Sequence, residues 1–235
     1  MNVNGWLFTD ADNTLWDTNR VFAEAQLGLL ESVEQFSGQR AHHDDRLAFV
    51  RTHDQRIAAK DHRGLKYPPA FLVQALWADL AGKLGAPDDV VASIVADYFT
   101  NLSKQADLRP GVKEALPALH AKGVEISIVS EGKRERVLET LAAHGLEAYI
   151  TRTVTGEKSA DMFRRLLKLA DNPVNAVVVG DQLDRDVAFA KAAGLTAVYF
   201  PGGFTPEWTD HKLLVHADAT IADFRDLIPM FDEQT

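Results

Sequence analysis

The sequence predicts an α/β fold: a Rossmann-like, mostly parallel sheet with helices on both faces, together with an inserted all-helical domain. From residue 107 to the end, short apolar runs alternate with stretches of helical length, an order typical of a parallel sheet. A single apolar run at residues 3–10 comes before an interruption, residues 19–106, in which apolar residues recur at helical spacing. We therefore expect a core of residues 1–18 and 107–235, with residues 19–106 as a separate helical domain.

The first strand is predicted at residues 3–10, where Trp6, Leu7 and Phe8 follow one another as in a strand buried on both faces. The elements that follow are predicted to be helices, because apolar residues recur every three or four positions and glycine or proline marks the ends. Pro68 stands where the first turn of a helix accepts proline. The helices of this domain are expected near residues 21–36, 44–60, 68–85 and 88–99.

The rest of the chain alternates between helices and strands. Gly123, Gly145 and Gly194 each follow a helical stretch and mark its end. Helices are expected near residues 112–122, 133–144, 161–170 and 186–194, with a last one from residue 223. Strands are expected at residues 124–129, 149–154, 176–179, 196–200 and 219–221. Helices of this length between strands indicate a parallel sheet that is covered on both faces.

Composition limits the partners of the protein. The chain has 235 residues, a formal net charge of −9 and a pI near 5.3, which argues against non-specific nucleic-acid binding through clustered lysine and arginine. It has no cysteine, which excludes disulfides, thiolate metal sites and cysteine nucleophiles. No apolar run reaches the ~20 residues that cross a bilayer, and the N-terminus lacks the pattern of a signal peptide. We expect a cytoplasmic protein without membrane association, as a monomer or homodimer.

Two carboxylates, Asp10 and Asp12, follow the first predicted strand directly, and Thr14 comes two residues later. In an extended chain Asp10 and Asp12 project to the same face, and at a strand's carboxyl end they point into the crevice where α/β sheets bind ligands. Two acids held together repel each other, so a cation is their natural partner. The plainer alternative is that residues 12–14 form a turn whose side chains bond nearby amides.

Later segments place further polar groups at the same sheet edge. Ser130 ends one predicted strand, Lys158 begins a predicted helix, and Asp181 and Asp186 follow the apolar strand at residues 176–179. The carboxylates suit Mg²⁺, while a hydroxyl and an ammonium suit phosphate oxygens. A carboxylate aligned with phosphorus can also act as a nucleophile. Taken singly, Ser130 is better explained as a cap of the next helix, which does not exclude contact with phosphate, and Lys158 is more often a solvated surface lysine.

These residues, in this order, resemble the four motifs of the haloacid dehalogenase superfamily of phosphotransferases. The four motifs are Asp10-x-Asp12-x-Thr14-Leu15, Ser130, Lys158, and Gly180-Asp181 with Asp186. The resemblance implies that Asp10 is the nucleophile and that Asp12 is a general acid and then a general base. It implies that Asp10, Asp181 and the backbone carbonyl of Asp12 bind Mg²⁺, with Asp186 as an outer acid of the metal site.

The same resemblance implies that Thr14, Ser130 and Lys158 bind phosphate, and that residues 19–106 are a helical cap that sets substrate specificity. One departure from the common family pattern is Glu131, which follows Ser130 where asparagine is frequent. It adds a negative charge near the phosphate site, so we expect its side chain to turn away or to contact the cap.

The acid at position 12 favours one reaction class. The dehalogenase branch has no acid there, whereas phosphoryl transfer from an alcohol ester benefits from an acid that protonates the leaving oxygen and later deprotonates water. We therefore predict a Mg²⁺-dependent phosphomonoester hydrolase that acts on a small soluble phosphorylated metabolite through an aspartyl-phosphate intermediate. The alternatives are a phosphomutase of the same superfamily and a non-hydrolytic binding protein on this fold.

A basic stretch lies in the helical domain. Residues 51–67 hold five basic and two acidic residues, a net charge of +3 in a chain of net charge −9. One interpretation is recognition of an anionic leaving group. The other is a solvated helix face with charge pairs four residues apart, which is the commoner origin of such a stretch. The candidates under the first interpretation are Arg51, Arg56, Lys60 and Arg63.

Overall fold

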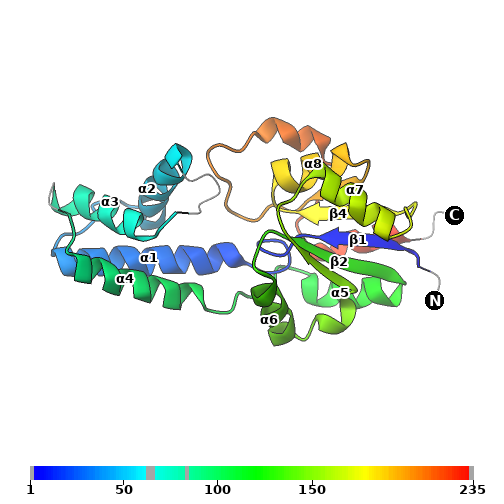
Figure 1. The fold of residues 1–235 in the computed structure, drawn as a ribbon, viewed down its shortest axis with the longest axis horizontal. Helices are drawn as coiled ribbons and strands as arrows, with labels where there is room; N and C mark the ends of the chain where they lie inside the picture. The colour runs from blue at the N-terminus through cyan, green and yellow to red at the C-terminus, as the bar shows by residue number, and fades with distance from the viewer. Residues whose placement is uncertain (1–2, 62–66, 83–84, 233–235) are drawn as a thin grey trace. The chain divides into compact units, whose positions relative to one another are not determined.

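A parallel sheet organises the structure, a computed structural model that describes residues 3–61, 67–82 and 85–232. In this part of the chain, six strands lie in the order β3-β2-β1-β4-β5-β6, and each pairs with its neighbours in parallel (Figure 1). The strands are β1 (Gly5–Thr9), β2 (Val124–Ser130), β3 (Arg152–Thr155), β4 (Ala176–Gly180), β5 (Thr196–Tyr199) and β6 (Ala219–Thr220). The predicted parallel sheet is confirmed.

Helices cover both faces of the sheet. In Figure 1, α5 (Val112–Ala121) and α6 (Arg134–His144) lie on one side of it, and α7 (Ala160–Leu169) and α8 (Ala188–Ala192) lie on the other. Every residue of β4 is buried as a result. Burial on both faces explains why the strands appear in the sequence as continuous apolar runs and not as an alternation of apolar and polar residues.

Some elements differ from those predicted. The expected C-terminal α-helix is a 3₁₀ helix, η4 (Phe224–Phe231), which has Pro229 inside it. A π-helical stretch, η2 (Leu183–Val187), comes directly before α8, so the helical structure begins three residues earlier than predicted. The predicted strand at residues 149–154 starts as a short 3₁₀ turn. The remaining 3₁₀ helices are η1 (Glu147–Tyr149) and η3 (His211–His216).

The chain divides into two compact units. The core unit comprises Met1–Asn19, Ala106–Thr205 and Thr209–Thr235, and the helical unit comprises Arg20–Gln105 and Pro206–Trp208. The described residues of the helical unit contain no strand and pack around a buried apolar centre. Its helices are α1 (Thr18–Ser37, which begins in the core unit), α2 (Arg46–Asp61), α3 (Ala70–Ala81) and α4 (Asp88–Leu102).

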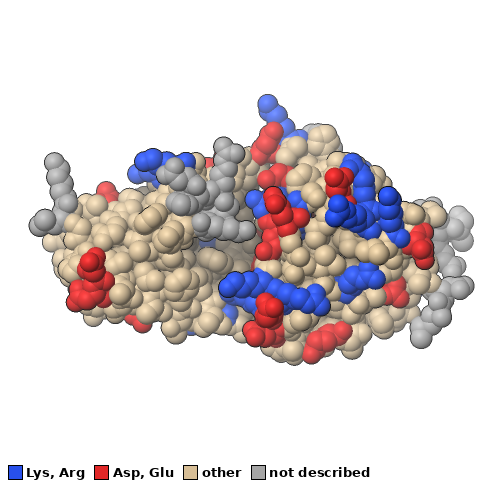
Figure 2. All heavy atoms as spheres, viewed as in Figure 1, with Lys and Arg blue, Asp and Glu red and all other residues tan. Residues whose placement is uncertain are grey.

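Two surface properties bear on partners. Within the described ranges, no helix is both long enough and apolar enough to span a membrane. On the face drawn in Figure 2, acidic and basic side chains lie close to one another over the core unit. That face therefore does not present the continuous basic surface on which non-specific nucleic-acid binding depends.

Candidate active site

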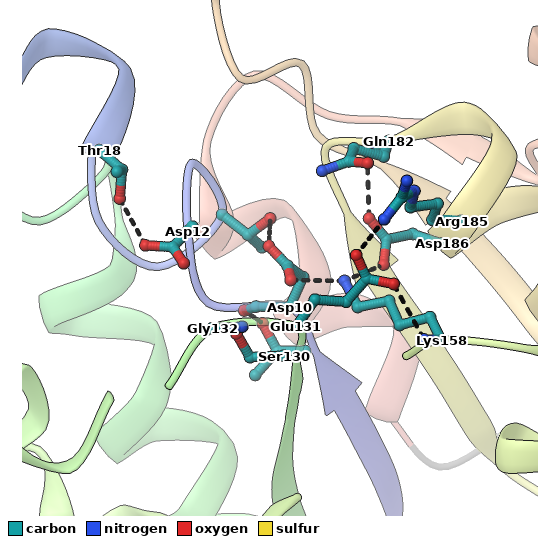
Figure 3. Close-up of polar contacts among 12 residues, drawn as sticks. Asp10, Asp12, Thr18, Ser130, Glu131, Gly132, Lys158, Gln182, Arg185 and Asp186 are labelled. Carbon is teal, nitrogen blue, oxygen red and sulfur yellow. Dashed lines mark hydrogen bonds and ion pairs between the residues drawn. The ribbon is translucent and has the colours of Figure 1, made fainter. Parts of the chain in front are cut away.

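The candidate site lies at the carboxyl ends of β1, β2 and β4. The strand order reverses at β1, since β2 and β3 lie on one side of it while β4 and β5 lie on the other. Open α/β sheets bind ligands at such a reversal, because the loops on either side diverge and leave a crevice. The loops that follow Thr9, Ser130 and Gly180 meet at this edge, and Figure 3 shows side chains from them directed toward one another.

Asp10 is the first residue after β1. Its backbone N–H donates to the carbonyl oxygen of Val179 at 2.9 Å, which extends the strand pairing by one residue. Its carboxylate is buried, with Oδ2 accepting a hydrogen bond from Thr14 Oγ1 at 3.1 Å and Oδ1 lying 2.5 Å from Lys158 Nζ. Burial raises the pKa of Asp10 to about 7; the charge of Lys158 opposes this rise and that of Asp186 adds to it.

Lys158 connects two carboxylates. Its Nζ lies 2.5 Å from Asp10 Oδ1 and 2.6 Å from Asp186 Oδ1, and its side chain is only 2% exposed. Burial alone would lower the pKa of Lys158, but the two carboxylates raise it above the ordinary value, so the ammonium stays charged. The alternative of a solvated surface lysine is therefore wrong.

Asp10, Asp181 and Asp186 form a group that suits a metal ion. One carboxylate oxygen of each lies within 4.8 Å of those of the other two. Asp181 Oδ1 is buried and has no hydrogen-bond partner among the described residues, as expected of an oxygen that awaits a non-protein ligand. Burial, followed by the charges of Asp10 and Asp186, raises the pKa of Asp181 well above its usual range. Three carboxylates with an unsatisfied oxygen are a donor set that fits Mg²⁺.

Asp12 follows on the same loop but has different partners. Its Oδ1 accepts hydrogen bonds from Trp16 Nε1 at 3.0 Å and from Thr18 Oγ1 at 2.6 Å, and Figure 3 shows the carboxylate directed to Thr18. Trp16 and Thr18 are themselves buried, so their positions are fixed by packing. The two acids of this loop are thus held by separate sets of donors.

Residues 12–14 form a turn, as the plainer alternative predicts, and this turn shapes the site. The N–H of Thr14 donates to the carbonyl oxygen of Ala11 at 3.2 Å. Asn13 has a φ of 62°, a left-handed conformation that asparagine adopts more readily than most residues. The turn brings Thr14 back to Asp10, so the turn and the functional interpretation are compatible.

Ser130 is buried at the end of β2. Its Oγ accepts a hydrogen bond from the N–H of Gly132 at 3.0 Å. The residue at the N-cap of α6 is Lys133, so the alternative of Ser130 as a helix cap is wrong. Because the hydroxyl acts as an acceptor in this turn, its proton can be donated to another oxygen.

Two glycines allow the backbone to approach the acids closely. A Cβ atom at Gly180 would lie 2.1 Å from Asp186 Cγ, and one at Gly202 would lie 2.5 Å from Asp181 Oδ2. Neither distance leaves room for a side chain, so both glycines are required by close approach. Gly202 follows β5 and therefore lies at the same sheet edge as the motifs.

Replacement of Gly180 by alanine is expected to displace Asp186 and to weaken Mg²⁺ binding about tenfold or more, because the added methyl group would occupy the space of the carboxyl group. Isothermal titration calorimetry measures this affinity. Gly28→Ala is a matched control, since its Cβ would come no closer than 3.4 Å to Asn101 Nδ2, an ordinary contact. Equal Mg²⁺ affinity in the Gly180 variant and the control would contradict the steric argument.

The basic candidates lie apart from these motifs in the sequence, on and after α2. Arg51 is partly buried, and its Nε donates to Gln26 Oε1 at 3.4 Å. Arg56 and Lys60 are exposed, and Arg63 lies outside the described residues. Arg51 thus takes part in the internal hydrogen bonding of the helical unit. The substrate-binding role of all four residues stays a prediction.

Four residues contribute to the site in ways that the sequence did not predict. Trp16 and Thr18 hold Asp12, the side chain of Asn13 bonds Asp181, and Gly202 packs against Asp181. One signal was available, because Gly202 comes two residues after the end of a predicted strand. The hydrogen bonds of Trp16 and Thr18 depend on the path of the loop, which no spacing rule gives.

Comparison with known proteins places the chain among known hydrolases. The family model of haloacid dehalogenase-like hydrolases matches residues 6–194. The glyceraldehyde 3-phosphate phosphatase of Pyrococcus furiosus is 22% identical over 97% of this chain and 93% of its own length. The ribulose-1,5-bisphosphate 5-phosphatase of Halopiger xanaduensis is 28% identical over 61% of this chain and 66% of its own length. A solved structure of a haloacid dehalogenase family hydrolase from Deinococcus radiodurans, with bound phosphate and sodium, shares the fold. The TM-score is 0.68, at 19% identity and with 99% of both chains covered.

Proposed function

This chain belongs to the haloacid dehalogenase-like hydrolase family, and we propose that it is a Mg²⁺-dependent phosphatase of small phosphorylated metabolites. The predicted family is confirmed. One observation carries the proposal: Asp10 is buried against Lys158, while Asp12, two residues later, is held separately by Trp16 and Thr18. The loop therefore offers one carboxylate as a nucleophile and another as a proton donor and acceptor.

Asp10 is the nucleophile in this proposal. One of its carboxylate oxygens forms a bond to phosphorus as the bond from phosphorus to the alcohol oxygen breaks, which leaves an aspartyl phosphate. Lys158 and Thr14 contact different oxygens of Asp10 and so restrict its orientation. The Lys158 ammonium and the Ser130 hydroxyl are the groups that would bind the oxygens of the transferred phosphoryl group.

Asp12 moves the protons. It gives a proton to the leaving alcohol oxygen, and it then takes a proton from the water that attacks the aspartyl phosphate. The second step releases inorganic phosphate and restores both aspartates to their starting forms. Because Trp16 and Thr18 both donate to Oδ1, Oδ2 is the oxygen that would carry the proton.

Asp10, Asp181 and Asp186 are the side chains that would hold Mg²⁺, together with the backbone carbonyl of Asp12 that the family resemblance implies. When bound, Mg²⁺ supplies positive charge that offsets the charge of the phosphate and favours the ionised form of Asp10. Three predictions stay predictions. They are that the helical unit selects the substrate, that the protein is cytoplasmic, and that it works as a monomer or homodimer.

The first test is hydrolysis of p-nitrophenyl phosphate with Mg²⁺, followed by a panel of phosphorylated metabolites. The names of the two relatives support sugar phosphates, so the panel includes glyceraldehyde 3-phosphate and ribulose 1,5-bisphosphate. We expect release of inorganic phosphate without any bisphosphate activator. A phosphomutase would instead move the phosphoryl group between sugar positions, and a binding protein would release no phosphate.

Replacement of Trp16 by phenylalanine is expected to lower the turnover of alkyl phosphates about tenfold, a part of the roughly 10²–10⁴-fold that acid catalysis contributes. The variant keeps the buried ring but removes the N–H that holds Asp12. Turnover of p-nitrophenyl phosphate should fall much less, because nitrophenolate leaves with little need of a proton. Trp208→Phe, at a partly exposed tryptophan, is the matched control. An equal loss on both substrates would argue against a role through Asp12.

A further inference from the structure

Glu131, directly after Ser130, connects three loops of the site. Its Oε1 accepts a hydrogen bond from the backbone N–H of Lys158 at 3.0 Å, and its Oε2 forms an ion pair with Nη1 of Arg185 (Figure 3). Arg185 lies in η2, the stretch that also carries Asp186. One side chain therefore connects the ends of β2 and β4 with the segment that presents Lys158.

The charge of this acid is balanced within the site. Glu131 follows the phosphate-binding candidate Ser130, where an unpaired carboxylate would repel a phosphate. The ion pair with Arg185 compensates that charge, and the bond to the Lys158 N–H occupies the other oxygen. Both oxygens of the acid thus have partners, on the segment that carries Lys158 and on the one that carries Asp186.

The contact between Glu131 and the Lys158 N–H lies just before α7. Ser159, the residue after Lys158, is the N-cap of α7, and two residues before Lys158 the N–H of Gly156 donates to the carbonyl oxygen of Ser130 at 3.0 Å. Within the short stretch from Gly156 to Ser159, Glu131 therefore contacts the backbone of Lys158, whose side chain reaches Asp10.

We propose that Glu131 is a positioning residue that fixes Lys158 directly and, through Arg185, the acidic loop from Asp181 to Asp186. This inference rests on the proposed function, because the groups that it positions are those assigned to phosphate and Mg²⁺. An ordinary partly exposed ion pair contributes little to stability. Glu131 differs from such a pair because one of its oxygens accepts from the backbone of Lys158 and the other pairs with the loop that carries the proposed metal ligands. Removal of a residue that orients metal ligands in this way commonly lowers metal affinity or activity.

The test compares four variants with the wild type: Glu131→Ala, Glu131→Gln, Arg185→Met and the double variant of the last two. Calorimetry gives the Mg²⁺ affinity, steady-state assay with p-nitrophenyl phosphate gives kcat and KM, and thermal unfolding gives Tm. Asp161→Asn is the matched control, because it removes an exposed ion pair, 2.5 Å from Asp161 Oδ1 to Arg164 Nη1, close to Lys158 in the sequence.

Glu131→Ala is expected to weaken Mg²⁺ binding and to lower kcat, each about tenfold, while the control matches the wild type. Glu131→Gln keeps an oxygen for the Lys158 N–H, so its loss should be smaller and equal to that of Arg185→Met. The double variant should be no worse than either single variant, because both remove the same ion pair.

Unchanged Mg²⁺ affinity and kcat in Glu131→Ala, or a loss confined to Tm, would overturn the positioning role. Additive losses in the double variant would overturn the assigned route through Arg185. A wild type that hydrolyses no phosphate ester would refute the proposed function instead. In that case the Mg²⁺ affinity of Glu131→Ala, measured without any turnover, still decides whether Glu131 positions the acidic loop.

Discussion

Substitution of Asp10 by asparagine is expected to lower kcat for p-nitrophenyl phosphate by about 10⁴-fold or more, which corresponds to about 5.5 kcal/mol of activation free energy. The carboxamide has nearly the same shape, and its oxygen can still accept the hydrogen bond from Thr14 Oγ1. It does not attack phosphorus as a carboxylate does, so no aspartyl phosphate forms. The substitution also removes one of three neighbouring acids, so we expect the variant to keep a cooperative thermal unfolding transition.

A second measurement connects this loss to the covalent step. Acid quenching of the wild type during turnover of a radiolabelled phosphate ester should leave label on the protein, and Asp10→Asn should retain none. Asp184→Asn is the control, because Asp184 is an exposed acid between Asp181 and Asp186 and should be dispensable. Full activity of Asp10→Asn would refute its assignment as the nucleophile.

Most of the fold was predictable because it follows from local patterns. A strand covered on both faces must be apolar along its whole length, so β4 stands out in the sequence as a continuous apolar run. Glycine marks the end of several helices, and Gly145 closes α6 with a φ of 66°. The features that were misjudged, such as the π-helical stretch at η2, depend on hydrogen bonds that residue type does not determine. The bonds from Asp186 and Val187 to the carbonyl oxygen of Gln182 are examples.

Site residues could be predicted only where acidic or other polar residues come at the ends of predicted strands. Asp10 and Asp181 could be found because an acid directly after a buried strand has few structural explanations. Trp16 could not, since a buried tryptophan is expected in any core and its hydrogen bond to Asp12 exists only once the loop has folded. Glu131 was noticed as an additional acid, but its partner Arg185 is 54 residues away, and only the sheet order brings the two together.

Removal of divalent metal is expected to lower turnover by about 10³-fold, because a metal ion contributes several kcal/mol of charge stabilisation in reactions of this class. Treatment with a chelator and return of Mg²⁺ measure this directly. Activity should return in full on addition of Mg²⁺. Unchanged turnover in the chelated protein would show that the group formed by Asp10, Asp181 and Asp186 does not need a metal to act.

Mg²⁺ binding is further expected to weaken as the pH falls below about 7. In the metal-free protein, burial raises the pKa of Asp10 to about 7, with Asp186 adding to the rise and Lys158 opposing it. Below that pH Asp10 carries a proton, which must leave before the oxygen can bind a cation. Above it the carboxylate is already ionised and binding costs no proton. The pKa of Asp181 is raised in the same direction by burial, so its proton adds to the dependence.

The sign of this linkage can be measured without any substrate. Calorimetric titrations of Mg²⁺ at pH 6 and pH 8, each in two buffers of different ionisation enthalpy, report both the affinity and the protons released. We expect weaker binding with proton release at pH 6, and tighter binding with little release at pH 8. An affinity that does not change between these values would mean that the charge of Lys158 outweighs burial and that Asp10 is ionised throughout. The site would then be a preformed anionic metal site.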